Sequence, residues 1–328
     1  MPRKIEISHR TIIFSVAFLL GIWFLYQIRE IIFTLFVAFI LMAALNPTVE
    51  KMEKVKIPRP LAILLIYIVF FTFFSLVIAG LVPPLVEQTA ILIDQIPGYI
   101  EQVNLPWLDK EVVLSQFAQL ASLPETLLKL TINIFQNLFK IIFQAVITFY
   151  LLMERKNLGK YLELLFSNNS LDRASQFVRR LEKRLGSWVR AEIFLMTIIG
   201  VMSYIGLRLV GVDFCLPLAV LAGILELIPS IGPTMSAVPA VIFGLTISSF
   251  HGVAVAALYI LIQEIENSII VPKVMGKNLG INPLLVIIAL SVGIKLGGIG
   301  GAVLAVPTFL VLQEAAHEIR TSDYFPKQ

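Results

Sequence analysis

The sequence predicts an all-α fold: a polytopic transmembrane helical bundle with two opposed broken (re-entrant) helical hairpins that form an inverted repeat. Of the 328 residues, 58% are hydrophobic and only 15% are charged, against about a quarter charged in soluble domains. Residues 11–28 and 61–82 carry no charge, and about 20 apolar residues let a helix cross the roughly 30 Å hydrocarbon core. A Pro/Gly-rich break also occurs twice in the second half of the chain.

Residues 1–82 are expected to form a transmembrane scaffold, built on the apolar runs 11–28, 31–45 and 61–82. The first run is longer than a typical signal-peptide core and a second follows almost at once, which predicts a retained span. Lys and Arg gather in 46–60 and 154–190, whereas 83–130 has two lysines against six acids. Because cytoplasmic loops are enriched in Lys and Arg, the charges predict a multi-pass protein of the cytoplasmic membrane with both termini in the cytoplasm.

Residues 83–130 are predicted to form an extracytoplasmic or interfacial segment. Apolar residues recur there at helical spacing among acids, namely Leu85, Leu92, Ile96, Tyr99 and Val103. This pattern is typical of an amphipathic helix at the membrane surface or at a contact between subunits, and equally of a packed surface helix. Residues 131–190 then supply a transmembrane helix and a basic cytoplasmic helical segment.

One face of the span 131–153 is polar. Spacings of four, three, four and four residues place five polar side chains on it: Asn133, Asn137, Lys140, Gln144 and Thr148. Lipid would penalise such a face, so it must meet protein or water. Two interpretations stay open, a seam between helices or subunits joined by polar side chains and part of a hydrated transport pathway.

The second half of the chain contains an internal repeat. The sequences SIGPTMSAVP (230–239) and GIGGAVLAVP (298–307) are identical at five of ten positions. Each lies between two apolar arms, which predicts hairpins near 214–250 and 281–313. One long span precedes each hairpin. If each hairpin enters the membrane and returns to its own side, a repeat unit crosses an odd number of times and its second copy must be inverted.

This arrangement points to a function in transport. Inverted repeats with broken helices near the middle of the membrane are a transporter architecture. Residues 191–316 are therefore predicted to form a transport module, and residues 317–328 a cytoplasmic tail.

The first break is a candidate substrate or ion site. Backbone freed of hydrogen bonds at Pro229, Gly232 and Pro233 is costly against lipid but acceptable where it lines a cavity or protein. Glu226 stands at the edge of this break. Insertion scales put the cost of an acid at the centre of a membrane helix at about 2.5–3.5 kcal/mol, so such acids usually face protein or water. A purely structural acid, hydrogen-bonded between helices, is the alternative.

A second pair of acids lies on the following span. Glu264 and Glu266 are two residues apart and therefore point to different sides of one helix, and Glu266 is the one expected to face the hairpins. Lys295 lies at the tip of the second hairpin, near Gly298 and Gly300. It is expected either to neutralise a carboxylate or attract an anionic solute, or to extend its charged end to the membrane interface.

Several motifs, in order and spacing, resemble the autoinducer-2 exporter (PerM-like) family over nearly the whole chain. They are LNPTVEKMEK (45–54), IPRP (57–60), PPLVEQ (83–88), ELIPSIGP (226–233), QEIENSIIVPKVMGKNLGINPL (263–284) and GIGGAVLAVP (298–307). The resemblance implies a transporter of a small solute that assembles into homo-oligomers. Some members are tied to export of the autoinducer-2 signal, and others to sodium– or lithium–proton antiport.

The family pattern also bears on single residues. Gln263, Glu266, Asn267 and Pro272 match the family's Q-x-x-E-N segment closely, whereas Glu264 lies outside that match. The family often has Asn where this chain has Glu226, so the resemblance does not imply a proton-carrying role at that position.

The sequence thus predicts a membrane transporter that moves a small polar solute or ion by alternating access, for example in export of an autoinducer-2-like signal. Sodium(lithium)/proton antiport, an uncoupled oligomeric pore and a membrane scaffold that holds a partner through 154–190 stay open. Expected partners are the lipid bilayer, the small solute, a proton or sodium ion and further copies of the chain. The net charge of +4 indicates membrane orientation rather than nucleic-acid binding.

An enzyme is not expected, nor is a cofactor or a metal site. His317-Glu318 lacks the second histidine of an H-E-x-x-H helix. The sequence also has no G-x-S-x-G elbow, no P-loop and no Cys/His metal cluster.

Overall fold

The computed structural model describes residues 9–102, 137–157, 159, 161, 168–229, 231–274 and 283–321. Within these ranges every regular element is a helix, which confirms the all-α prediction. Five helices of this part are long and apolar enough to cross a membrane: Arg29–Lys54, Arg59–Gly80, Asp172–Val210, Ser249–Val274 and Leu284–Arg320. Shorter apolar helices lie at Ile13–Gln27, Cys215–Leu225 and Ile231–Leu245. The chain is therefore a polytopic helical membrane protein.

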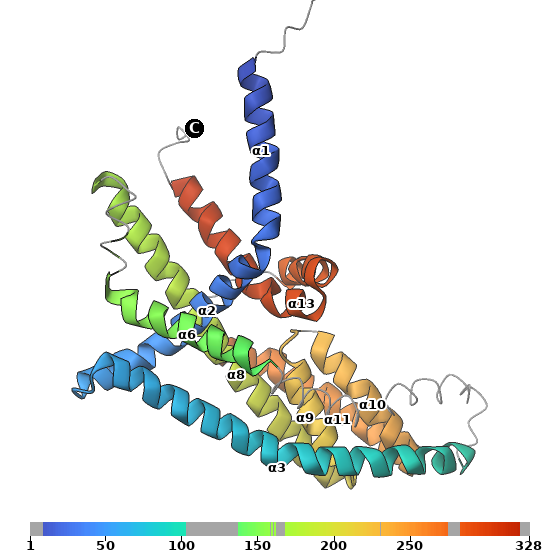
Figure 1. The fold of residues 1–328 in the computed structure, drawn as a ribbon. Coiled ribbons are helices and arrows are strands. Elements are labelled where there is room, and N and C mark those ends of the chain that lie inside the picture. The colour runs from blue at the N-terminus through green and yellow to red at the C-terminus, as the bar shows by residue number, and fades with distance from the viewer. Residues whose placement is uncertain are drawn as a thin grey trace, which may run out of the picture.

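The N-terminal half contains α1 (His9–Gln27), α2 (Arg29–Lys54), α3 (Arg59–Gln102) and α6 (Leu138–Glu154). Helix α1 projects away from the rest of the bundle (Figure 1), while α2, α3 and α6 pack together. Their shared core consists of Met42, Val49, Ala62, Ile63 and Leu152. Helix α3 runs without interruption to Gln102, so the start of the predicted segment 83–130 is the end of this helix, and the rest lies outside the described residues.

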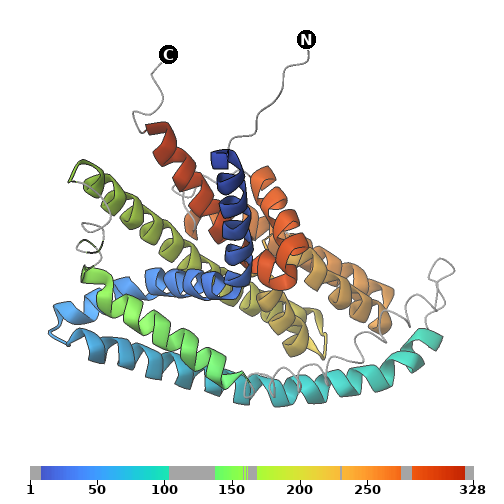
Figure 2. The same cartoon turned by 45° about the horizontal axis from the view of Figure 1, so that its top comes forward.

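The C-terminal half begins with the 3-10 turn η1 (Arg155–Asn157) and the 43-residue helix α8 (Asn168–Val210). It continues with α9 (Cys215–Leu225), α10 (Ile231–Ile247), α11 (Ser249–Ile265), the π-helical turn η2 (Glu266–Ile270), α12 (Val271–Val274) and α13 (Pro283–Thr321). In both views α9, α10 and α11 lie together beside one half of α8 (Figures 1 and 2). These helices and η2 share the largest core, which includes Leu195, Phe214, Leu218, Phe243 and Val255.

Helices α8 and α9 pack backbone against backbone. A Cβ atom on Gly223 would lie 2.8 Å from the carbonyl oxygen of Met196 and 3.3 Å from the Cα of Gly200. Lipid is as apolar as a leucine side chain, so membrane helices associate through close packing, and small residues permit it. This close approach fixes the position of α9, and with it the break that follows.

Both predicted breaks interrupt a helical path. The first separates α9 from α10, and the second is a kink at Gly297 and Gly298 inside α13. The two arms of α13 double back on each other, because a Cβ on Gly301 would lie only 2.0 Å from the carbonyl oxygen of Gly293. Gly298 has φ 58°, a conformation that side chains disfavour. The re-entrant, inverted arrangement of the two hairpins stays a prediction.

The two hairpins are in contact through Ile228. Ile228, in the first break, packs against Leu290, Ala302 and Ala305 in the arms of α13. Farther along α13, Leu310 joins a core with residues of α2 and α8. The C-terminal hairpin is therefore connected both to the first break and to the N-terminal scaffold.

Candidate functional site

The first break places Glu226 where α9 ends. The Glu226 N–H donates to Ala222 O, and Gly232 N–H donates to Ile228 O, so the chain turns tightly rather than opening into a loop. A Cβ on Gly232 would lie 1.8 Å from the Leu225 carbonyl oxygen. Glycine is thus required for the turn to close, and the closed turn leaves the Glu226 side chain 2% exposed.

The second acid lies at the start of a π-helical turn. Glu266 opens η2 and is 5% exposed, whereas Glu264 is exposed and accepts a hydrogen bond of 2.8 Å from Ser268 Oγ. Pro272 follows this turn and has no N–H to donate to a residue one turn back, which accounts for the local widening of the helix. Single π-turns inside helices occur frequently at functional sites.

A third acid, Glu192 of α8, lies with these two. Glu192 is 2% exposed and interacts electrostatically with both Glu226 and Glu266. Glu226 and Glu266 share a side-chain hydrogen bond. We call Glu192, Glu226 and Glu266 the carboxyl trio. It gathers side chains from α8, the end of α9 and η2.

The trio has hydrogen-bonding capacity to spare. Both oxygens of Glu192 and one oxygen each of Glu226 and Glu266 are buried and find no hydrogen-bond partner among the described residues. An ionised carboxylate can only accept hydrogen bonds, so the bond between Glu226 and Glu266 requires a proton on one of them. Within the described ranges, no group of three His, Cys, Asp or Glu is arranged to hold a metal ion. Glu226 and Glu266 are suited to sharing a proton in this state, because only a protonated carboxyl group can donate to the other.

The other predicted site residues lie outside the trio. Gln263 is partly buried on the same helix as Glu264, and Asn267 is exposed. Pro229 is partly buried, while Gly232 and Pro233 are buried in the break. Lys295, Gly298 and Gly300 are exposed at the kink of α13, and a Cβ on either glycine would meet no atom within 4 Å.

The polar stripe of α6 is divided between surface and interior. Asn133 lies outside the described residues, and Asn137 and Lys140 are exposed. Gln144 Nε2 donates to the Thr34 carbonyl oxygen of α2 at 3.4 Å. Thr148 is buried and donates to Gln144 O at 2.8 Å. The inner part of the stripe therefore faces α2.

Sequence reasoning did not find Glu192. It is the second residue of the apolar run 191–211 and follows Arg190 directly, a position typical of the polar end of a span rather than of its interior. Its position on α8, facing Glu226 and Glu266, depends on how α8 packs against α9 and α11.

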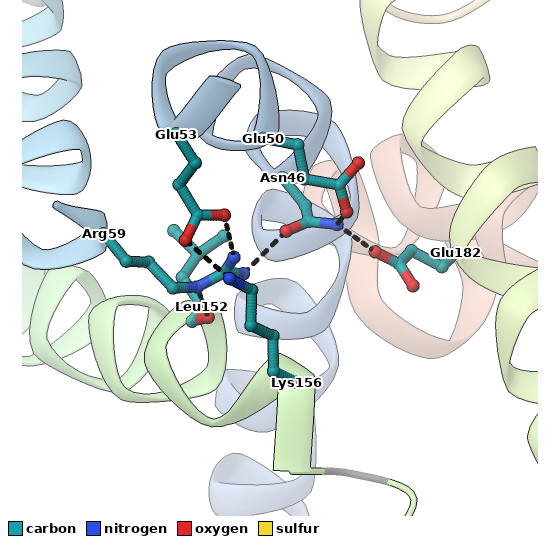
Figure 3. Close-up of polar contacts among 7 residues, drawn as sticks. All are labelled: Asn46, Glu50, Glu53, Arg59, Leu152, Lys156 and Glu182. Carbon is teal, nitrogen blue, oxygen red and sulfur yellow. Dashed lines mark hydrogen bonds and ion pairs between the residues drawn. The ribbon is translucent and has the colours of Figure 1, made fainter. Parts of the chain in front are cut away.

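A second buried polar cluster joins α2, α3 and α6 (Figure 3). Arg59 donates hydrogen bonds of 2.8 Å to Asn46 Oδ1, Glu53 Oε2 and the Leu152 carbonyl oxygen. Lys156 Nζ donates to the other oxygen of Glu53, also at 2.8 Å. The motifs LNPTVEKMEK and IPRP supply Asn46, Glu53 and Arg59, so they meet in one network.

That network reaches α8, and α8 in turn is bridged to α13. Asn46 Nδ2 donates to Glu182 Oε1 at 2.8 Å. Toward α13, Arg180 pairs with both Glu314 and Glu318, and Arg184 Nη1 donates to Glu314 Oε2 at 2.9 Å. Charged and polar bridges thus connect α8 to both halves of the bundle.

A multi-pass helical bundle with buried carboxyl groups beside broken helices belongs to the class of integral membrane transporters. The family model described as AI-2E family transporter matches residues 12–321, so the chain belongs to this transporter family. This confirms the resemblance stated from the motifs.

Curated relatives extend over most of the chain. YueF of Bacillus subtilis (strain 168), named as a candidate transport protein, is 26% identical over 314 residues, which cover 88% of this chain and 84% of YueF. YrrI of the same strain, named in the same way, is 27% identical, covering 87% of this chain and 86% of YrrI. A protein of Halobacillus andaensis named as a sodium-lithium/proton antiporter is 24% identical, covering 92% and 94%.

Proposed function

We propose that this membrane transporter moves a small polar solute by alternating access, coupled to a proton held by the carboxyl trio. The observation that supports this is the hydrogen bond between Glu226 and Glu266 in a buried setting. Loss of its proton would leave two uncompensated charges side by side, and buried unpaired charge is costly. Proton loss would therefore favour a rearrangement that separates or hydrates the two groups. A ligand that binds one arrangement better than the other is then coupled to the proton.

The rearrangement we propose takes place between the first break and α13. Ile228 in that break already packs against the arms of α13, so a shift of one would displace the other. A polar signal molecule of the autoinducer-2 kind is the cargo to test first, because the family description points to it. Assembly into homo-oligomers in the cytoplasmic membrane is part of this proposal.

Sodium(lithium)/proton antiport is the second candidate, in which the metal cation is itself the cargo. It is favoured by the name of the Halobacillus andaensis relative and by the unpartnered carboxyl oxygens of the trio. Since no group of three acids among the described residues is arranged to hold a metal ion in this state, the cation would bind to oxygens of the trio in a second arrangement, after the proton has left. An uncoupled pore or a scaffold would have no use for three buried acids.

Flux in proteoliposomes tests the proposal. Purified protein would be reconstituted with a trapped pH-sensitive dye, a pH gradient imposed, and uptake of the signal molecule, sodium and lithium followed separately. We expect Glu266→Gln to abolish gradient-driven uptake while exchange without a gradient persists, because glutamine keeps size and hydrogen bonding but cannot release a proton. One charge moved through 100 mV is worth about 2.3 kcal/mol, or roughly fifty-fold in an inward–outward equilibrium.

Glu264→Gln is the matched control. It makes the same chemical change two residues away, on a side chain that is exposed and bonded to Ser268. We expect it to transport like the unmodified protein. Undiminished driven uptake by Glu266→Gln would remove this residue from the mechanism, and equal losses in both variants would show that the charge of this helix, and not the buried site, matters.

A further inference from the structure

A cavity of about 770 Å³ lies between the first turns of α2 and α6, far along the chain from the carboxyl trio. Its size is within the roughly 300–1,000 Å³ of typical small-molecule sites. The two helices lie side by side in both views (Figures 1 and 2), and they run in the same direction, since Thr34 near the start of α2 meets Gln144 near the start of α6. None of the residues that line the cavity belongs to the trio.

One end of the cavity is positively charged. Arg29 and Lys140 line it, with Glu30 as the single acid among the lining residues. Arg29 is the first residue of α2 and Lys140 lies in the first turn of α6, so the positive ends of two helix dipoles meet at the same place. The Arg29 guanidinium stacks over the Tyr26 ring at 4.0 Å, which holds it in position. This end is suited to an anion.

The wall beside this charged end is apolar and aromatic. Phe33, Phe143 and Ile147 line the cavity one to two helical turns farther in. The rings of Phe139 and Phe143 stack with their centroids 6.4 Å apart, and both side chains are exposed on the outside of the bundle. Helix α6 lies within the span 131–153 that the sequence predicts, and an exposed aromatic side chain of a spanning helix faces hydrocarbon. The cavity therefore opens toward lipid chains and not toward bulk water.

We propose that this cavity is a binding site for an anionic phospholipid. The phosphate would sit between Arg29 and Lys140, and an acyl chain would lie along Phe33, Phe143 and Ile147. Basic pockets between transmembrane helices recognise anionic head groups in this way. A free anion would use the two cations but gain nothing from the aromatic wall, so the combination selects an amphiphile. Lys140 of the polar stripe thereby acquires a role separate from either a seam or a water path.

Lipid retention by the full-length protein tests the proposal. Delipidated protein in detergent would be titrated with phosphatidylglycerol and with phosphatidylcholine of the same chains, and bound lipid counted by native mass spectrometry. We expect the protein to prefer phosphatidylglycerol. In the double variant Arg29→Gln/Lys140→Gln, its dissociation constant should rise about 30-fold, since each cation near a membrane surface contributes about 1 kcal/mol and 1.4 kcal/mol is tenfold. Phosphatidylcholine binding should change little.

Two further variants separate specific from general effects. Arg208→Gln/Lys273→Gln removes the same charge from exposed positions elsewhere and should leave phosphatidylglycerol binding unchanged. Phe143→Ala should weaken the binding of both lipids equally, because it removes an apolar side chain from the cavity wall and leaves the charges in place. The elution volume of each variant in size-exclusion chromatography would show that it remains folded.

Three results would overturn the proposal. Equal affinity of the unmodified protein for the two lipids would show that the cavity does not recognise the head group. Equal losses in the two double variants would mean that overall charge alone attracts the lipid. Displacement of phosphatidylglycerol by millimolar inorganic phosphate would show that the cavity recognises a free anion.

Discussion

Replacing Arg59 with methionine tests whether the polar network of Figure 3 stabilises the packing of α2, α3 and α6. Arg59 is 8% exposed and donates to three acceptors, one on each side chain of Asn46 and Glu53 and one on the Leu152 backbone. Methionine fills a similar volume with a flexible apolar chain. The change therefore removes the hydrogen bonds and the charge while it leaves little space empty.

The expected loss of unfolding free energy is about 3 kcal/mol. Removing one partner of a buried ion pair typically costs about 3–5 kcal/mol, because the other partner stays buried without compensation. We expect a loss at the lower end of this range, because Glu53 keeps its hydrogen bond from Lys156 Nζ. The larger part of the loss should come from Asn46 Oδ1 and the Leu152 carbonyl oxygen, both of which lose a charged donor.

Unfolding in mixed micelles, followed by circular dichroism at 222 nm, would measure this loss. Lys156→Met is the control, because it removes a bond to the same Glu53 from a side chain that is 64% exposed, and exposed pairs contribute at most about 1 kcal/mol. The reasoning would be refuted if Arg59→Met were as stable as the unmodified protein, or if Lys156→Met were destabilised as much.

Three further changes test other parts of the bundle in the same unfolding assay. Gly232→Ala places a Cβ 1.8 Å from the Leu225 carbonyl oxygen, so we expect a loss of about 1–3 kcal/mol or more from overpacking, and an unchanged stability would contradict the tight turn. The Cβ of Gly298→Ala would meet no neighbour, but alanine would have to adopt φ 58°, which side chains disfavour. We therefore expect the unfolding free energy to fall by about 1–3 kcal/mol through backbone strain, without any packing defect. Glu314→Gln removes the buried charge and one of the two oxygens that accept from Arg180 and Arg184, and it should cost about 1.5–3 kcal/mol, more than Glu318→Gln, whose side chain is 28% exposed. The reverse order would show that the bridge between α8 and α13 depends on its outer member.

The helix breaks were predictable from local chemistry. Proline restricts the backbone and glycine frees it, and the Pro/Gly-rich stretches around Pro229 and Gly298 interrupt the helical path where the sequence indicates, whereas the isolated Pro47 and Pro307 lie inside helices. The opposite sides of Glu264 and Glu266 follow from helical geometry alone. These features need no knowledge of the rest of the fold.

The helix lengths and the carboxyl trio were harder to predict from the sequence, for different reasons. The apolar run ends at residue 82, but α3 continues through Pro83 and Pro84 to Gln102, and α8 begins 23 residues before the apolar run 191–211. The end of an apolar run therefore does not mark the end of a helix. The hydrogen bond between Glu226 and Glu266 joins residues 40 apart in the chain, and Glu192 comes from 34 residues before Glu226. Such pairings depend on how the helices pack, which a single sequence does not state.

Helix α8 has no proline across its 43 residues and is about 65 Å long at 1.5 Å per residue, roughly twice the thickness of the hydrocarbon core. It therefore behaves as one rigid rod with a part inside the bilayer and a part outside. Arg184 and Glu192 are eight residues apart on this rod, about 12 Å along its axis. A change of tilt driven by proton loss from the trio would displace the ion pairs to Glu314 in the same movement. Events at the carboxyl trio would thus reach the far surface of the protein mechanically, without any loop having to move.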